Sequence, residues 1–131
     1  MKKKVLLIAA AVIILFIAVS AIFIFRSAEK ASIEARNIQV QDVDLSSIED
    51  GIYLGEYSFN GLVKVEVEVS VKNNAISDIN LIKHDNGRGK NAEAIPQEVI
   101  KAQSLNVDTV TGATVSSKVI LKAIEDALTK K

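Results

Sequence analysis

Five Ser or Thr residues and one glycine fall within ten positions near the C-terminal end of the chain, in "DTVTGATVSS", residues 108–117. Hydroxyl groups both donate and accept hydrogen bonds, and an apolar-periodic stretch typical of a helix follows directly. The first turn of a helix has unpaired backbone amides and a partial positive charge. The stretch therefore predicts either an ordinary helix capped by Ser116 or Ser117, or a site for a phosphate group.

In the second interpretation the small residues have separate tasks. Gly112 lets the backbone approach a ligand without a Cβ in the way, and Ala113 keeps the next position small. Short hydroxyl donors would complete the phosphate site; they are Thr111, Thr114, Ser116 and Ser117.

Strands precede this stretch, and the clearest is "LVKVEVEVSVK", residues 62–72, in which every second residue is valine. A period of two predicts a strand with one buried face and one solvent-facing side. Asn60-Gly61 comes before it and Asn73-Asn74 after it, and both pairs favour tight hairpin turns. With "GIYLGEYSF" (51–59) and "AISDINLIKH" (75–84), the pattern predicts a meander of three antiparallel strands.

Two helices are predicted after the strands. Pro96 in "AIPQEVIKAQSL" (94–105) suits the first turn of one helix. The other is expected from Ser116 or Ser117 to Leu128, with Ile120, Ala123, Ile124, Ala127 and Leu128 on one apolar stripe. The expected fold class is α+β, a small antiparallel sheet with helices packed on one face. "NGRGK" (86–90) lacks the spacing of a phosphate-binding P-loop and is interpreted as a loop.

The N-terminal region predicts a membrane anchor. Residues 5–25 are uncharged, with Ser20 as the one polar residue, and such a helix reaches roughly 31 Å, enough to span a bilayer. Three lysines precede the run, so the N-terminus is expected in the cytoplasm and the rest of the chain outside it. A cleaved signal peptide ending near Ala18 and Ser20 is the alternative, but five apolar residues follow that position.

The predicted organisation is a cytoplasmic N-terminus (1–4), a transmembrane anchor (5–25), a membrane-proximal spacer (26–49) and an extracytoplasmic folded domain (50–131). Residues 26–131 carry 13 basic and 16 acidic side chains, a balance that argues against a nucleic-acid partner. The chain has no cysteine, which excludes a disulfide, a thiolate metal site and a lipidated cysteine. No metal site and no catalytic residue are predicted.

The order of residues adds a second line of inference. Asp108, Thr111, Gly112, Ala113 and Thr114 stand as D-x-x-T-G-A-T. This order, the hairpin unit "EDGIYLGEYSFNGLVKVEVEVSVKNNAISDINLIKH" (49–84) and the connecting "AEAIPQEVIKAQSLNVD" (92–108) resemble the FMN-binding domain family. That family includes the flavin-carrying subunits of the Rnf and Na⁺-translocating NADH:quinone oxidoreductase complexes and small membrane-anchored proteins. The resemblance covers residues 50–129.

The resemblance implies a cofactor, FMN, and an attachment site. In many family members the last threonine of the motif is esterified by FMN through a phosphoester bond, installed by a separate flavin transferase that uses FAD. Thr114 would then carry covalent FMN, and Asp108 would be a determinant for the transferase. Gly112 and Ala113 would give steric clearance, and Thr111 would be a secondary phosphate donor. Other members hold FMN without the covalent bond.

The function implied by the resemblance is a membrane-anchored extracytoplasmic flavoprotein that transfers electrons between redox proteins or a quinone. His84, the one histidine, is expected either at the surface of a strand end or in contact with the flavin. The alternative function is a membrane-tethered non-redox binding or sensor module, which uses the same anion site for another phosphorylated ligand.

Overall fold

A computed structural model describes residues 1–85 and 89–130, which form two compact units, Met1–Glu34 and Ala35–Lys131. Helix α1 (Lys2–Arg36) makes up the first unit apart from Met1, and its last two residues are assigned to the second unit. Within the described residues it is the one helix long and apolar enough to cross a membrane. The predicted helical span is therefore present, and its orientation across a membrane stays a prediction. Residues 86–88 of the expected loop lie outside the described residues.

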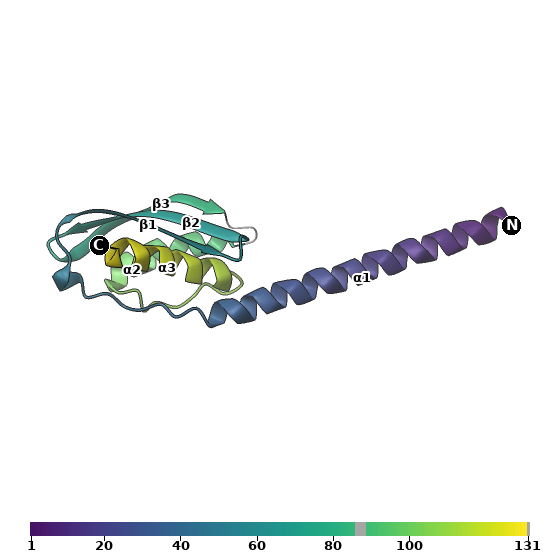
Figure 1. Cartoon of the computed structure of the whole chain (residues 1–131), viewed down its shortest axis with the longest axis horizontal. Helices are drawn as coiled ribbons and strands as arrows, with labels where there is room; N and C mark the ends of the chain where they lie inside the picture. The colour runs from purple at the N-terminus through teal and green to yellow at the C-terminus, as the bar shows by residue number, and fades with distance from the viewer. Residues whose placement is uncertain (86–88, 131) are drawn as a thin grey trace. The chain divides into compact units, whose positions relative to one another are not determined.

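The second unit contains a three-stranded antiparallel sheet in the order β1-β2-β3, as predicted (Figure 1). The strands are β1 (Gly51–Phe59), β2 (Val63–Lys72) and β3 (Ala75–Asp85). Each of the four residues in the two hairpin turns, at positions 60–61 and 73–74, has a positive φ. Asn and Gly tolerate this conformation best, which explains why the turns could be located from the sequence.

Two helices cover one face of the sheet, α2 (Ile95–Ala102) over β3 and α3 (Thr114–Thr129) over β1 and β2 (Figure 1). Short 3-10 helices, η1 (Leu45–Ser47) and η2 (Lys90–Ala94), precede β1 and α2. Alternate valines of β2 meet the apolar stripes of the helices, so the fold is α+β as expected. The largest fully buried apolar side chains of the core are Val65, Val67, Val69, Ile95, Val99, Val119, Ile120, Leu121 and Ile124.

Gly55 sets the close approach of α3 to β1. A Cβ at this position would collide with the carbonyl oxygen of Ala123 and the backbone nitrogen of Ala127. A glycine in mid-strand thus allows helix and sheet backbones to approach each other directly.

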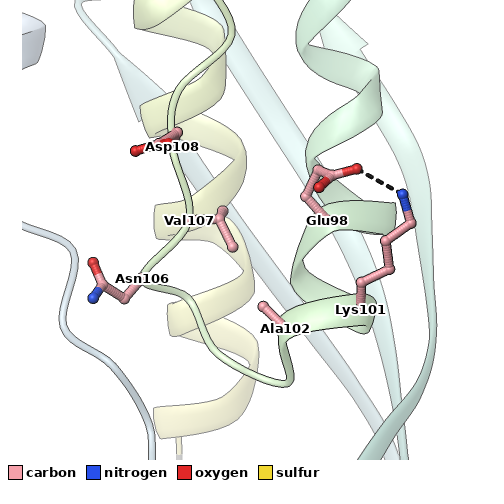
Figure 2. Close-up of a pocket in the computed structure, with 6 residues that line it drawn as sticks. All are labelled: Glu98, Lys101, Ala102, Asn106, Val107 and Asp108. Atoms are coloured by element: carbon pink, nitrogen blue, oxygen red, sulfur yellow. Dashed lines mark hydrogen bonds and ion pairs between the residues drawn. The ribbon is translucent and has the colours of Figure 1, made fainter.

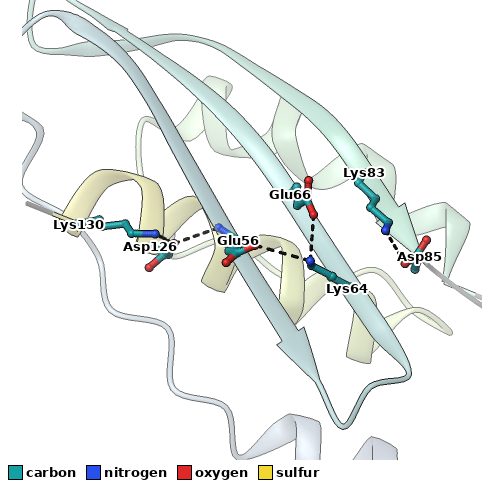
Figure 3. A network of polar contacts seen from close by, with 7 residues as sticks. All are labelled: Glu56, Lys64, Glu66, Lys83, Asp85, Asp126 and Lys130. Carbon is teal, nitrogen blue, oxygen red and sulfur yellow. Dashed lines mark hydrogen bonds and ion pairs between the residues drawn. The ribbon is translucent and has the colours of Figure 1, made fainter.

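A polar network extends from the opposite face of the sheet around the edge of β1 to the C-terminal end of α3 (Figure 3). The Lys64 ammonium lies 3.0 Å from a carboxylate oxygen of Glu66 and 3.7 Å from one of Glu56. The backbone amide of Glu56 donates to the Asp126 carboxylate at 3.0 Å, and Asp126 also pairs with Lys130. The exposed ion pairs contribute little stability, whereas the Asp126 contact satisfies an amide at the free edge of β1.

Residues 37–49 pack on the domain as an extended strap, although residues 26–49 were predicted as a spacer outside it. The Gln41 amide donates to Glu125 of α3 at 3.0 Å. The Asp42 carboxylate accepts hydrogen bonds from the Ser104 hydroxyl and the Leu105 amide. The compact unit begins at Ala35. The predicted boundary of the FMN-binding domain at Asp50 stays a prediction.

Candidate functional site

The T-G-A segment of the motif forms a tight turn before α3. The Ala113 amide donates to the Val110 carbonyl oxygen at 2.9 Å, and Gly112 has φ +80°. Turns of this kind need a positive φ at their third residue, which glycine supplies at no steric cost. A Cβ on Gly112 would meet no described atom within 4 Å. Backbone conformation within the domain therefore explains this glycine. The space beside it is open, and its use as clearance for a ligand stays a prediction.

Helix α3 begins at Thr114, so the prediction of a start at Ser116 or Ser117 was wrong. Ala113 is the residue before the helix, and it offers no side-chain cap. The first intrahelical hydrogen bond is made by the Ser117 amide, which donates to the Ala113 carbonyl oxygen at 2.9 Å. The amides of residues 114–116 precede that bond at the positive end of the helix dipole, and they donate to no described residue.

Ser116 and Ser117 are both buried, with exposed fractions of 2% and 0%. The Ser117 hydroxyl accepts a hydrogen bond from the Val110 amide at 3.0 Å. Neither serine caps α3. The Ser117 hydroxyl instead links Val110, at the start of the T-G-A turn, to the fourth residue of the helix. Their expected contact with a phosphate stays a prediction.

Of the five residues of the D-x-x-T-G-A-T motif, Ala113 is buried and the other four reach solvent. Thr114 is half-buried, and Asp108, Thr111 and Gly112 are exposed. Within the described part of the chain, no hydrogen bond engages the Thr114 hydroxyl. An accessible hydroxyl therefore stands at the first helical residue, beside three amides that donate no hydrogen bond to any described residue.

Asp108 also borders a groove of about 470 Å³ between the C-terminal part of α2 and the connection to α3 (Figure 2). The side chains of Asn106 and Asp108 point to one side of the extended connection, and Val107 points to the other (Figure 2). Across the groove, the Lys101 ammonium pairs with Glu98 at 2.9 Å. The groove thus meets the motif at its acidic residue and does not include Thr114.

His84 lies near the end of β3, but it is not the surface residue that its position suggested. Its side chain is 3% exposed, and Nδ1 lies 3.1 Å from a carboxylate oxygen of Glu93 in η2. The sequence offered no signal for Glu93, because the pairing depends on how η2 folds back under the sheet. Val110 and Asp42 were missed for the same reason, since their contacts join segments that no local pattern connects.

These features fit a phosphate group beside Thr114, either of bound FMN or of a phosphodiester between FMN and the threonine. The helix start supplies free amide donors and a favourable dipole, and the first turn contains no acidic side chain that would repel the anion. The space beside Gly112 is open. Three hydrogen bonds, two between backbone groups and one to the Ser117 hydroxyl, hold the turn and the helix start, so little of the site has to be ordered on binding.

Comparisons with known proteins agree with this chemistry. A model of the FMN-binding domain family matches residues 59–129. A urocanate reductase from Eggerthella lenta is 38% identical over 68 residues, which is 50% of this chain and 11% of that protein. A NADH:acrylate oxidoreductase from Vibrio harveyi is 44% identical over 36 residues, 28% of this chain and 4% of that protein. The chain thus spans a small part of both relatives. The family match covers more than half of the chain, which therefore belongs to the FMN-binding domain family and has FMN as its cofactor.

Proposed function

We propose that this protein is a membrane-anchored, extracytoplasmic electron carrier in which FMN is esterified to Thr114. The observation that carries the proposal is the position of Thr114, an accessible hydroxyl on the first residue of α3 beside free amides, inside the family match. When bound, FMN supplies one- and two-electron transfer, and the protein supplies attachment and orientation.

The proposed attachment is a phosphoryl transfer to the Thr114 hydroxyl from FAD, catalysed by a flavin transferase. The Thr114 oxygen forms a bond to the FMN phosphorus, the pyrophosphate bond of FAD breaks, AMP leaves, and the hydroxyl proton is released. The free amides of the first helical turn stabilise the charge on the phosphoryl oxygens. Asp108 is exposed on the connection, where a transferase can contact it.

The anchor places the carrier at a membrane. Helix α1 has the length and composition of one span, and Lys2, Lys3 and Lys4 favour a cytoplasmic N-terminus. If the C-terminus lies outside the cytoplasm, alkaline phosphatase fused to it should be active. Green fluorescent protein fused to the same end should be dark, because it does not become fluorescent after export by the general secretory route. The opposite pair of results would reject the extracytoplasmic location.

The relatives carry names of reductases, but those names belong to proteins of which this chain covers 11% and 4%. What the shared stretch supports is a flavin-carrying module rather than the reduction of a particular substrate. We therefore infer that redox proteins or a quinone deliver electrons to this chain and accept them from it.

Mass spectrometry and denaturing gels test the attachment. Protein produced with an active flavin transferase should gain the mass of one FMN less one water and keep flavin fluorescence after denaturation. Thr114→Val preserves the volume of the side chain and should abolish both signals. Thr111→Val is the matched control and should keep the covalent flavin. Retention of covalent flavin in Thr114→Val would reject this residue, and a wild type without any flavin would favour the non-redox binding module.

A further inference from the structure

The imidazole of His84 is enclosed by the folded domain, and one of its two nitrogens lacks a partner. Nδ1 contacts Glu93, whereas the buried Nε2 forms no hydrogen bond with the described residues. Buried polar atoms are paired in the great majority of cases, and exceptions often mark a functional group or an absent ligand. The unpaired Nε2 therefore needs an explanation.

Glu93 determines what Nε2 can bind. An ionised carboxylate accepts hydrogen bonds and cannot donate them, so the 3.1 Å contact places the ring hydrogen on Nδ1. In the neutral ring, Nε2 then carries a lone pair and acts as an acceptor. While the ring is neutral, the missing partner is consequently an O–H or N–H donor.

His84 lies at the same end of the domain as Thr114. In the sheet, His84 of β3 lies opposite Val65 of β2, close to the turn that joins β1 and β2. Ala123 and Ala127 lie against Gly55, and residues 128–129 line a cavity with Tyr53. Later residues of α3 thus lie beside earlier residues of β1, so the helix runs antiparallel to the strand. The start of α3 therefore lies toward the end of β1 and the end of β3 (Figure 1). In addition, η2, which contributes Glu93, contacts α3.

We propose that His84 contacts the cofactor, with Nε2 accepting a hydrogen bond from a donor of FMN, and that Glu93 is a positioning residue that fixes the tautomer. This proposal rests on the attachment of FMN at Thr114. An ester bond at the phosphate leaves the rest of FMN free to rotate, so a second contact is needed to orient the ring. FMN has two kinds of suitable donor, the ribityl hydroxyls and N3–H of the ring. Because the side chain is 3% exposed, the proposed contact requires the residues that cover the ring to move aside.

Nitrogen NMR on selectively labelled histidine gives a direct test, because His84 is the one histidine of the chain. Full-length protein in detergent is compared with and without covalent flavin. Without flavin we expect a protonated Nδ1 and the resonance of a free acceptor at Nε2. With flavin, the Nε2 resonance should move toward that of a hydrogen-bonded acceptor. Identical Nε2 resonances in the two samples would overturn the proposal, whereas failure of the wild type to take up flavin would instead reject the proposed function.

Variants separate cofactor contact from a purely structural role. His84→Phe should keep flavin on Thr114 but lower its fluorescence anisotropy, since the ring loses its second contact. His84→Gln retains an acceptor and should restore part of the anisotropy. Glu93→Gln can also donate to Nδ1 and should give mixed tautomers in the NMR spectrum. Glu98→Gln, an exposed control that also interrupts an ion pair, should match the wild type. Equal anisotropy in His84→Phe and wild type would contradict the contact.

Free flavins identify which donor is used. Riboflavin carries the ribityl hydroxyls and N3–H, whereas lumiflavin carries N3–H without the ribityl chain. Unflavinylated His84→Phe is titrated with both flavins, and unflavinylated wild type and His84→Gln are titrated in the same way as references. Weaker binding of riboflavin alone assigns the ribityl chain, and weaker binding of both assigns N3–H. No change for either flavin would overturn the proposal.

Discussion

The Val110 amide donates a hydrogen bond to the Ser117 hydroxyl at 3.0 Å, which links the start of the T-G-A turn to the fourth residue of α3. The same turn is closed by the Ala113 amide on the Val110 carbonyl oxygen. Val110 is thus held through both of its backbone polar groups. This arrangement fixes Gly112 and Thr114 relative to the helix start before any cofactor arrives.

Replacing the hydroxyl of this pair should weaken both the fold and the site. In Ser117→Ala the partly buried Val110 amide loses its partner, which costs about 1 to 3 kcal/mol. Urea unfolding should show this loss, and flavin attachment should slow because the turn is less well held. Ser58→Ala, at an exposed position of β1, is the control and should be within about 0.5 kcal/mol of the wild type. Equal stability of the two variants would contradict the role given to Ser117.

Much of the fold could be predicted because its signals are local. The alternation of β2, the Asn and Gly turns and the apolar stripe of α3 each depend on residues within one element, and all three are present. The start of α3 was misplaced because Ser and Thr are favoured caps, and no local pattern revealed that Ser116 and Ser117 would be buried.

The strap and the histidine pair show where local patterns fail. Gln41 and Glu125 are 84 residues apart in the sequence, and the hydrogen bond between them depends on the assembled domain. His84 and Glu93 are nine positions apart, and they meet because η2 folds back against the end of β3. No pattern in the sequence between them indicates this contact. The types of the motif residues could be read from the sequence, but their exposure and partners required the tertiary structure.

Gly55 should be far less tolerant of substitution than a glycine in a turn. In Gly55→Ala the new Cβ collides with the backbone of α3 at Ala123, so helix and strand must separate at a cost of about 3 kcal/mol or more. Thermal and urea unfolding both measure this loss. Gly61→Ala is the matched control, because its Cβ would enter open space and a positive φ costs roughly 1 kcal/mol. A Gly55→Ala variant as stable as Gly61→Ala would contradict the close approach of α3.

The strap should stabilise the domain although it precedes the family match. A soluble fragment of residues 35–131 retains the contacts of Gln41 and Asp42, whereas a fragment of residues 50–131 loses them. Within the described part of the chain, five hydrogen bonds join residues 37–49 to the rest of the domain, because the carbonyl oxygens of Glu49 and Ser46 also accept from Tyr53 and Asn74. At about 0.5 to 1.5 kcal/mol each, they predict a difference of roughly 2.5 to 7.5 kcal/mol in the free energy of unfolding. Urea unfolding of the two fragments measures it. Coincident unfolding curves would show that residues 37–49 rest on the domain without supporting it.

Acid should loosen the strap through Asp42. The Ser104 hydroxyl, and then the Leu105 amide, lower the pKa of Asp42 below its ordinary value of 3.8, against a smaller opposing effect of burial. A carboxyl with a lowered folded pKa contributes stability above pH 3.8 and loses it as the pH falls through the folded value. Asp42→Asn cannot ionise, so at neutral pH its free energy of unfolding should be lower than that of the wild type, by at most about 1 kcal/mol because the site is exposed. This deficit should shrink below pH 3.8. Asp44 also has a lowered pKa, but it is present in both proteins and its contribution cancels. Urea unfolding at a series of pH values from 6 down to about 2.5 would test this difference, since the window is set by the lowered pKa. A deficit that stays constant across the series would show that ionised Asp42 does not hold the strap.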